Sequence, residues 1–384
     1  MRYIRFSSAA AVAAAIVTCV TGGPAAAGDD ASTPVPCYTS ALTNAISSAS
    51  SGDTLSLARD CTYHLTAALP DIVQPFTIRG NGATIVRDGN PTPAFRIFHV
   101  VSTGTGSFRL EKLTVRGGNV VGNGGGILVD SGAKLALVGV DVIDNTATAN
   151  GGGVALATGA TATIRRSWLA FNNANNGGGV ASQGMLTVEG SEFGRNHAQA
   201  LGGGLLQSGS IAFIHASVIS RNAAGGSGGG VYNRSGAQTT IIESKIANNT
   251  AAGATGGGLV NLGGGSTLTL EKSEVSGNVV GGPGGDGGGI YNSGTATTRL
   301  TLKGSKVIRN SANGPNAGAN LSQAGGIFND SGSVTLDHSY VRNNASTAAP
   351  GGLRTNNGAT LIDSTITHNI PTNCVPNPIP GCTD

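Results

Sequence analysis

Residues 202–222 read GGGLLQSGSIAFIHASVISRN, and residues 228–249 repeat that order as GGGVYNRSGAQTTIIESKIANN. Each stretch begins with glycines, continues with short aliphatic runs and ends on asparagine. The last glycine of such a cluster recurs at Gly126, Gly153, Gly179, Gly204, Gly230, Gly258, Gly289, Gly326 and Gly352. Most intervals are about 25 to 28 residues, and a repeat of roughly 20 to 50 residues indicates a solenoid.

The pattern inside each unit indicates strands. Around Ser217, Ile214 lies three residues before, Ile219 two after and Asn222 five after. Aliphatic residues two apart are typical of a strand with one buried face, and the unit is too rich in Gly and Asn for helices. The asparagines that close the units should stack as an interior ladder that binds the turn backbone. They are Asn145, Asn172, Asn196, Asn222, Asn249, Asn278, Asn310, Asn344 and Asn369.

A second strand is expected directly after each glycine cluster, as at Val231, with a recurring asparagine two residues on, as at Asn233. Stacked coils would place like residues above like, about 4.8 Å apart. The sequence therefore predicts an all-β, single-stranded parallel β-helix. We expect the right hand, because parallel crossovers are almost always right-handed.

The chain divides into four predicted segments. Residues 1–27 read as a secretory signal peptide, with Arg2 and Arg5 before an apolar stretch and Ala25-Ala26-Ala27 at the cleavage site. Residues 28–75 form an N-terminal cap and first strand, with a short helix over 39–51 that stops at Gly52. Residues 76–370 form the β-helix. Residues 371–384 are a Pro- and Cys-rich tail whose prolines cannot extend a strand ladder.

Two loops and two disulfides are expected in addition. The longer repeat intervals around 281–286 and 313–323 indicate loops that bulge from one corner. Cleavage of the signal leaves four cysteines, an even number that suggests two disulfides in an exported chain. Of the three possible pairings, the local one is the most economical, and four free thiols are the alternative. The local pairing joins Cys37 to Cys61 and Cys374 to Cys382.

Composition excludes several classes of protein. Glycine is abundant, at 63 residues, but lacks the strict three-residue period of collagen. The net charge of +3 is small and forms no basic stripe, so we expect no nucleic-acid partner. The sequence contains no zinc-ligand spacing, phosphate loop or nucleophile elbow, so we expect no metal and no cofactor. After signal removal no segment is long and apolar enough for a membrane helix.

The repeat resembles that of the polymorphic outer-membrane proteins, which combine a Gly-Gly-Ala-Ile type motif with a Phe-x-x-Asn motif. Residues 193–196, Phe-Gly-Arg-Asn, match the second motif, and the resemblance covers roughly residues 117 to 369. The N-terminal part looks like the start of secreted pectate-lyase-like β-helix proteins. The resemblance implies a surface or adhesive β-helix. The chain ends just after the last coil without a membrane barrel, so we expect a secreted rather than an autotransported form.

The candidate catalytic residues are charged side chains that should face outward and stack in columns, at the same position of successive coils. Stacking should bring five such side chains into neighbouring coils: Glu189, Glu192, Arg195, His215 and Arg221. Paired carboxylates can split a glycosidic bond, and Arg or His can remove a proton beside a uronate carboxylate. The alternative is that these columns are surface ion pairs, since opposite charges alternate along them.

An aromatic column two residues after the glycine cluster supplies the candidate glycan contacts. It contains Tyr232, Tyr291 and Phe328, with Val260 between them, and it should face outward because its neighbours on both sides face in. Aromatic rings can stack on sugars, and packing between coils is the competing interpretation.

These patterns favour a monomeric, secreted or surface-exposed β-helix that acts as a non-catalytic adhesion or glycan-binding scaffold. Its expected partner is a polysaccharide or a cell-surface component. A polysaccharide lyase or glycoside hydrolase, acting in a groove on the side of the β-helix, is the alternative, since the charged cluster and enlarged loops favour it.

Overall fold

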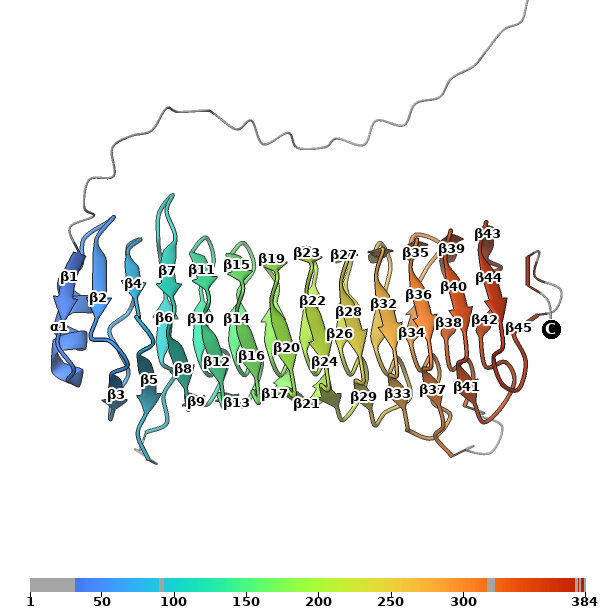
Figure 1. The fold of residues 1–384 in the computed structure, drawn as a ribbon, viewed down its shortest axis with the longest axis horizontal. Helices are drawn as coiled ribbons and strands as arrows, with labels where there is room; N and C mark the ends of the chain where they lie inside the picture. The colour runs from blue at the N-terminus through green and yellow to red at the C-terminus, as the bar shows by residue number, and fades with distance from the viewer. Residues whose placement is uncertain (1–31, 90–92, 316–321, 377–378, 380, 383–384) are drawn as a thin grey trace, which may run out of the picture. The chain divides into compact units, whose positions relative to one another are not determined.

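The computed structural model describes residues 32–89, 93–315, 322–376, 379 and 381–382, which form a parallel β-solenoid of about 11 turns (Figure 1). Four parallel sheets, called here A, B, C and D, run along the solenoid and have 13, 12, 11 and 9 strands. Each regular turn passes through A, B, D and C in that order. The predicted all-β parallel fold is confirmed, and the right hand stays a prediction.

The strands of each sheet follow the chain order from turn to turn. Sheet A contains β1 (Ser32–Val35), β2 (Thr54–Leu57), β4 (Thr77–Arg79), β7 (Phe108–Glu111), β11 (Lys134–Val138), β15 (Thr161–Arg165), β19 (Met185–Glu189), β23 (Ile211–His215), β27 (Gln238–Ile242), β31 (Thr267–Glu271), β35 (Arg299–Lys303), β39 (Ser333–Asp337) and β43 (Thr360–Ile362). Sheet B contains β3 (Thr62–Leu65), β5 (Thr84–Arg87), β8 (Thr114–Arg116), β12 (Asp141–Ile143), β16 (Trp168–Ala170), β20 (Glu192–Gly194), β24 (Val218–Ser220), β28 (Lys245–Ala247), β32 (Glu274–Ser276), β36 (Lys306–Ile308), β40 (Tyr340–Arg342) and β44 (Thr365–Thr367).

Sheets C and D close each turn. Sheet C contains β6 (Phe98–Val100), β10 (Ile127–Val129), β14 (Val154–Leu156), β18 (Val180–Ser182), β22 (Leu205–Ser208), β26 (Val231–Arg234), β30 (Leu259–Leu262), β34 (Ile290–Ser293), β38 (Ile327–Asn329), β42 (Leu353–Thr355) and β45 (Cys374–Val375). Sheet D contains β9 (Asn119–Val120), β13 (Thr146–Ala147), β17 (Asn173–Asn176), β21 (His197–Leu201), β25 (Ala223–Ala224), β29 (Thr250–Ala251), β33 (Val279–Val280), β37 (Ser311–Ala312) and β41 (Ala345–Ser346).

The core consists of aliphatic columns that follow the register of the sheets. In sheet A, Ile214 pairs with Ile241, which pairs with Leu270, and all three side chains are fully buried. One turn therefore presents an apolar surface that only the next turn can cover. Burial of apolar area, at roughly 25 cal/mol per Å², is the main force that stacks the turns.

The predicted asparagine ladder is present after the sheet B strands from β12 to β44. The Oδ1 of Asn249 accepts hydrogen bonds from the backbone N–H and the Nδ2 of Asn222, at 2.9 and 3.0 Å. The Nδ2 of Asn222 also donates to the carbonyl oxygen of Phe193 in the turn before. The same pattern links all the predicted members from Asn145 to Asn369, and Asn373 extends it by one step.

The residue before each ladder asparagine turns the chain out of sheet B. Arg195 and Arg221 both have φ of +56°, the left-handed conformation. That sharp corner carries the next backbone group inward, where the asparagine amide binds it. A second buried ladder, predicted from Asn233, runs through Asn261, Asn292 and Asn329 inside sheet C.

The glycine clusters serve two different needs. Gly202, the first of its cluster, has φ of +67°, which glycine adopts without strain. Gly204, the last, does not need a positive φ. A Cβ there would lie 2.8 Å from the carbonyl oxygen of Gly230 and 3.0 Å from the Nδ2 of Asn222. The last glycine is therefore required by the close approach of successive turns to the asparagine ladder.

The N-terminal end of the described region is covered by the predicted helix. Helix α1 (Thr39–Ser48) buries Leu42 and Ile46 against the first turn. The helix begins at Thr39 as predicted, after Tyr38 as an N-cap without a side-chain capping bond, but it ends earlier, with Ala49 rather than Gly52 as the C-cap. Strands β1 to β3 already belong to sheets A and B, so the solenoid begins inside the predicted cap segment.

Both predicted disulfides are present. Cys37 is joined to Cys61 and Cys374 to Cys382, one pair at each end of the solenoid. Two disulfides indicate an oxidising compartment. In the described part of the chain no helix is long and apolar enough to cross a bilayer. The predicted signal peptide lies outside the described residues, as does most of the predicted loop at 313–323.

Candidate functional site

The predicted catalytic residues lie on two sheets and one corner. Glu189 and His215 are register partners on the outer face of sheet A, and Glu192 begins the next strand, in sheet B. Arg195 and Arg221 occupy the corner that follows sheet B, where the Arg195 guanidinium lies 5.5 Å from the ring centroid of Phe171. The structure thus places the five residues in adjacent turns but not around one common hollow.

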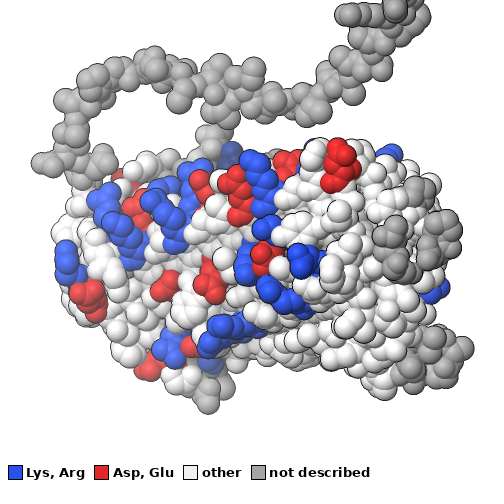
Figure 2. Space-filling view, turned by 45° about the vertical axis from the view of Figure 1, so that its right-hand side comes forward, with Lys and Arg blue, Asp and Glu red and all other residues white. Residues whose placement is uncertain are grey.

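Most of these charged columns pair between neighbouring turns. Arg165 binds Glu189 at 3.0 Å, and three further pairs follow the same rule. They join Lys245 to Glu274, Lys303 to Glu271 and His215 to Glu243. Lys, Arg, Asp and Glu are interspersed over the face shown in Figure 2. Exposed pairs of this kind contribute less than about 1 kcal/mol each, so they mainly prevent like charges from stacking.

The predicted aromatic column lies outside the main core, on the outer side of sheet C. Its rings, however, are covered: Tyr232 and Phe328 are each only 6% exposed, and Tyr291 is partly buried. Leu201 and Leu262 pack against this column from neighbouring columns. Burial also raises the pKa of Tyr232 and Tyr291. This burial favours the competing interpretation, packing between coils, and contact of this column with a sugar stays a prediction.

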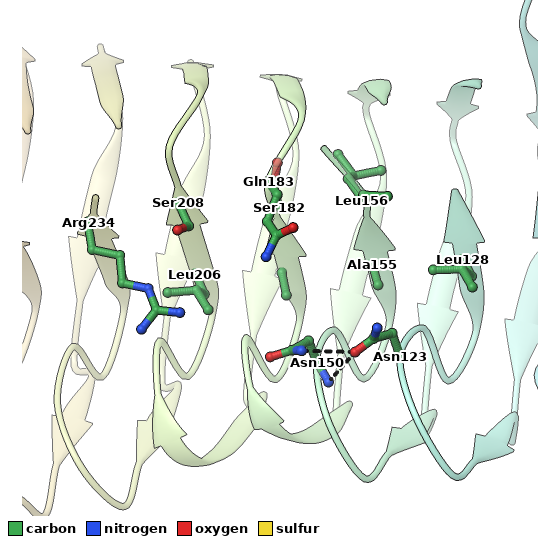
Figure 3. Close-up of a pocket in the computed structure, with 12 residues that line it drawn as sticks. Asn123, Leu128, Asn150, Ala155, Leu156, Ser182, Gln183, Leu206, Ser208 and Arg234 are labelled. Carbon is green, nitrogen blue, oxygen red and sulfur yellow. Dashed lines mark hydrogen bonds between the residues drawn. The ribbon is translucent and has the colours of Figure 1, made fainter. Parts of the chain in front are cut away.

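The same outer column of sheet C becomes hollow two to three strands from Tyr232 toward the N-terminus. Its successive members are Leu128, Ala155, Ala181 and Leu206, and the two alanines lie between the two leucines. A cavity of about 150 Å³ opens over them (Figure 3). The alanines make this space because they are too short to fill a layer that the leucines on either side fill.

One rim of this pocket is a partly exposed asparagine ladder. Asn123 Oδ1 accepts hydrogen bonds from the backbone N–H and the Nδ2 of Asn150, at 3.2 and 2.9 Å, and Asn150 accepts one from Asn176. In Figure 3 the Asn123 nitrogen points away from Asn150. That nitrogen has no hydrogen-bond partner among the described residues, so the ladder presents two unused N–H donors at the pocket edge.

The opposite rim is formed by Gln183, Ser208 and Arg234. The Arg234 side chain extends from β26 toward Leu206 and the pocket (Figure 3). Its Nε is buried without a hydrogen-bond partner, and no carboxylate of the described chain pairs with its guanidinium. An unpaired guanidinium over an apolar floor is the strongest electrostatic feature of the pocket.

A charged cluster lies at the N-terminal side of the pocket. His99, the register partner of Leu128, has its Nδ1 3.0 Å from Asp71 and its Nε2 2.9 Å from Asp130. Both ring nitrogens face carboxylate oxygens, so the bridge is complete when the imidazole carries both protons. Arg96 donates to the carbonyl oxygen of Asn123, and burial lowers its pKa. This cluster ties three successive turns together and limits the pocket on that side.

A second charged cluster lies at the C-terminal end of the same face. Arg354 lies 5.6 Å from the ring centroid of Phe328, which stacks on Tyr291. Nearby, burial raises the pKa of Asp286 to about 7, although a hydrogen bond from the N–H of Gln323 and the charge of Arg354 both lower it. Large rings fill this part of the column, so the face has no comparable hollow there.

The pocket has the composition of a small-molecule site. Among the residues that the structure describes, no group of three or more His, Cys, Asp or Glu side chains is arranged to hold a metal ion. An apolar floor with a few placed amide, hydroxyl and guanidinium groups is the usual composition of a small-molecule site.

Sequence reasoning missed this pocket, although two signals for it exist. Ala155 and Ala181 occupy a column that elsewhere holds large residues, and asparagines recur one repeat apart at 123, 150 and 176.

Searches against protein-family models, curated proteins and solved structures found no match to this chain.

Proposed function

We propose that this chain is a secreted glycan-binding β-solenoid that recognises sugar in the pocket on the outer face of sheet C. The observation that carries the proposal is the hollow over Ala155 and Ala181, rimmed by the amides of Asn123 and Asn150. A cavity of about 150 Å³ accepts one six-membered ring. The apolar floor matches the C–H face of a sugar, and the rim amides match its hydroxyl groups.

Three further features support this proposal. The disulfides fit an exported protein, and an extracellular location would bring the pocket to polysaccharides and cell surfaces. The repeat resembles that of surface and adhesive β-helix proteins. The register of the sheets holds the pocket rigid, because its floor residues are strand residues paired on both sides. A preformed site loses little conformational entropy when a ligand binds.

The test is binding of the whole chain to a panel of neutral and acidic mono- and oligosaccharides, measured by calorimetry. Ala181→Leu should reduce the affinity at least tenfold, because a leucine in this column fills the hollow as Leu206 does in the next strand. Ala136→Leu is the matched control, since Ala136 occupies an outward position in sheet A. Binding that is equal in both variants, or no binding to any sugar, would refute the proposal.

A polysaccharide lyase or glycoside hydrolase is the second candidate. Glu189 and His215 are register partners on an open strand face, which keeps a carboxylate and an imidazole one turn apart. The combined Glu189→Gln and His215→Ala change should abolish release of reducing or unsaturated ends if this candidate is correct. Release that persists in the double variant, with the fold intact, would reject these residues as catalytic.

A further inference from the structure

We infer that the sheet C pocket recognises a single acidic sugar unit at the end of a glycan chain, with its anionic group bound by Arg234. The inference rests on the proposed glycan-binding function and adds to it the charge of the ligand and the part of the chain that enters. Two observations carry it independently: the unpaired guanidinium at the rim and the short length of the hollow.

The charge of the ligand follows from Arg234. Its Nε is buried without a partner, and the structure places no acidic side chain of the described residues against its guanidinium. A carboxylate or sulfate in the pocket would accept from the two terminal nitrogens of the guanidinium in a two-point contact, which a neutral hydroxyl cannot reproduce.

Arg96 and Arg354, on the same face, also have a buried Nε without a partner, but neither lines the pocket. At the N-terminal side Arg96 donates a hydrogen bond to the carbonyl oxygen of Asn123, and His99 lies between Asp71 and Asp130. At the C-terminal end Arg354 lies over Phe328. Arg234 is thus the lining cation that is not engaged by another group of the described chain.

The length of the ligand follows from the floor of the pocket. Leu128 and Leu206 are three strand spacings apart, about 14 Å between backbones, and their side chains occupy part of that span. The larger side chains of Leu206 and then Tyr232 occupy the column beyond Ala181, so the hollow ends on that side. A polymer lying along the face would meet these side chains, whereas a terminal ring can enter from solvent.

The first experiment compares three monosaccharide probes by calorimetry on the whole chain: glucuronic acid, its methyl ester and glucose. Glucuronic acid should bind at least tenfold more tightly than either neutral probe, and added salt should weaken only its binding. Arg234→Gln should remove the preference, whereas Arg234→Lys should restore part of it. Arg165→Gln is the matched control, because this arginine is exposed on sheet A and pairs with Glu189.

The second experiment tests the position of the unit. An oligosaccharide with glucuronic acid at its non-reducing end should bind, and one with the same unit only in its interior should not. Equal binding of both would overturn terminal recognition. Equal binding of the ester and the acid would overturn the role of charge. If in either case Ala181→Leu still abolished binding, the proposed function would stand without this inference, whereas absence of binding to all probes would remove both.

Discussion

Asn222 and Asn249 are stacked one turn apart, and a single oxygen, the Oδ1 of Asn249, accepts from both the backbone N–H and the Nδ2 of Asn222. Both side chains are at most 1% exposed. Each asparagine therefore satisfies two donors and one carbonyl oxygen, all of the previous turn. The ladder acts as a buried substitute for the water that an open corner would otherwise bind.

Asn222→Ala should lower the free energy of unfolding by roughly 1–3 kcal/mol, because it leaves a buried N–H of Asn196 and the carbonyl oxygen of Phe193 without partners. Urea unfolding followed by circular dichroism measures the change. Asn44→Ala, at an exposed position of α1, is the control and should have little effect. An unaltered midpoint for Asn222→Ala would show that the ladder does not stabilise the fold.

Gly204→Ala should destabilise the solenoid by about 1–3 kcal/mol, since the added methyl would lie 2.8 Å from the carbonyl oxygen of Gly230. The backbone cannot retreat without breaking the ladder contact at Asn222. Gly281→Ala is the matched control, because a Cβ there meets nothing within 4 Å. The comparison requires only the two melting temperatures, and equal values would contradict a steric role for the last glycine.

The raised pKa of Asp286 predicts that the folded state becomes less stable as the pH rises. Burial raises its pKa to about 7 in the folded state, above the value near 4 of an unfolded chain. Between these values the folded state binds more protons than the unfolded state, so the contribution of Asp286 falls as pH rises from about 4 to about 7. The stability of the Asp286→Asn variant relative to that of the unmodified chain should therefore be greater at pH 8 than at pH 4.

Chemical denaturation at both pH values tests the Asp286 prediction. The exposed Asp60→Asn is the control. Asp286→Asn retains an oxygen that can accept the N–H of Gln323, so the backbone contact is preserved. A stability difference between the Asn variant and the unmodified chain that stays constant from pH 4 to pH 8 would refute the assignment.

The fold and the asparagine ladders could be predicted from the repeat, because each turn of a solenoid contacts only the turns before and after it. An asparagine that recurs at the same place in every unit must meet its own copies once the units stack, so the spacing alone identified Asn222 and Asn249 as neighbours. The local cysteine pairing was also correct. Each disulfide joins two cysteines that are close in sequence, so the pairing could be predicted without knowing how the rest of the chain folds.

The pocket required information that the repeat does not carry. Whether an outward residue is exposed depends on what neighbouring columns and corners place over it. Tyr232 and Phe328 are large enough to fill their layer, whereas Ala155 and Ala181 are too short to fill theirs and a cavity lies over them. The cluster of Asp71, His99 and Asp130 lies largely in the irregular first turns, where no period relates its members. The helix cap at Tyr38 likewise depends on contacts with the first strands.

The disulfides have a consequence for the order in which the molecule can come apart. Every turn of a solenoid touches only its neighbours, so loss of structure spreads most easily from an end, where a turn has one neighbour instead of two. Cys37–Cys61 and Cys374–Cys382 close the chain at those two places. Unravelling from either end must then begin with a cross-linked segment, which gains less conformational entropy when it unfolds. The cross-links thus act as end clamps that slow proteolysis and denaturation of the whole array.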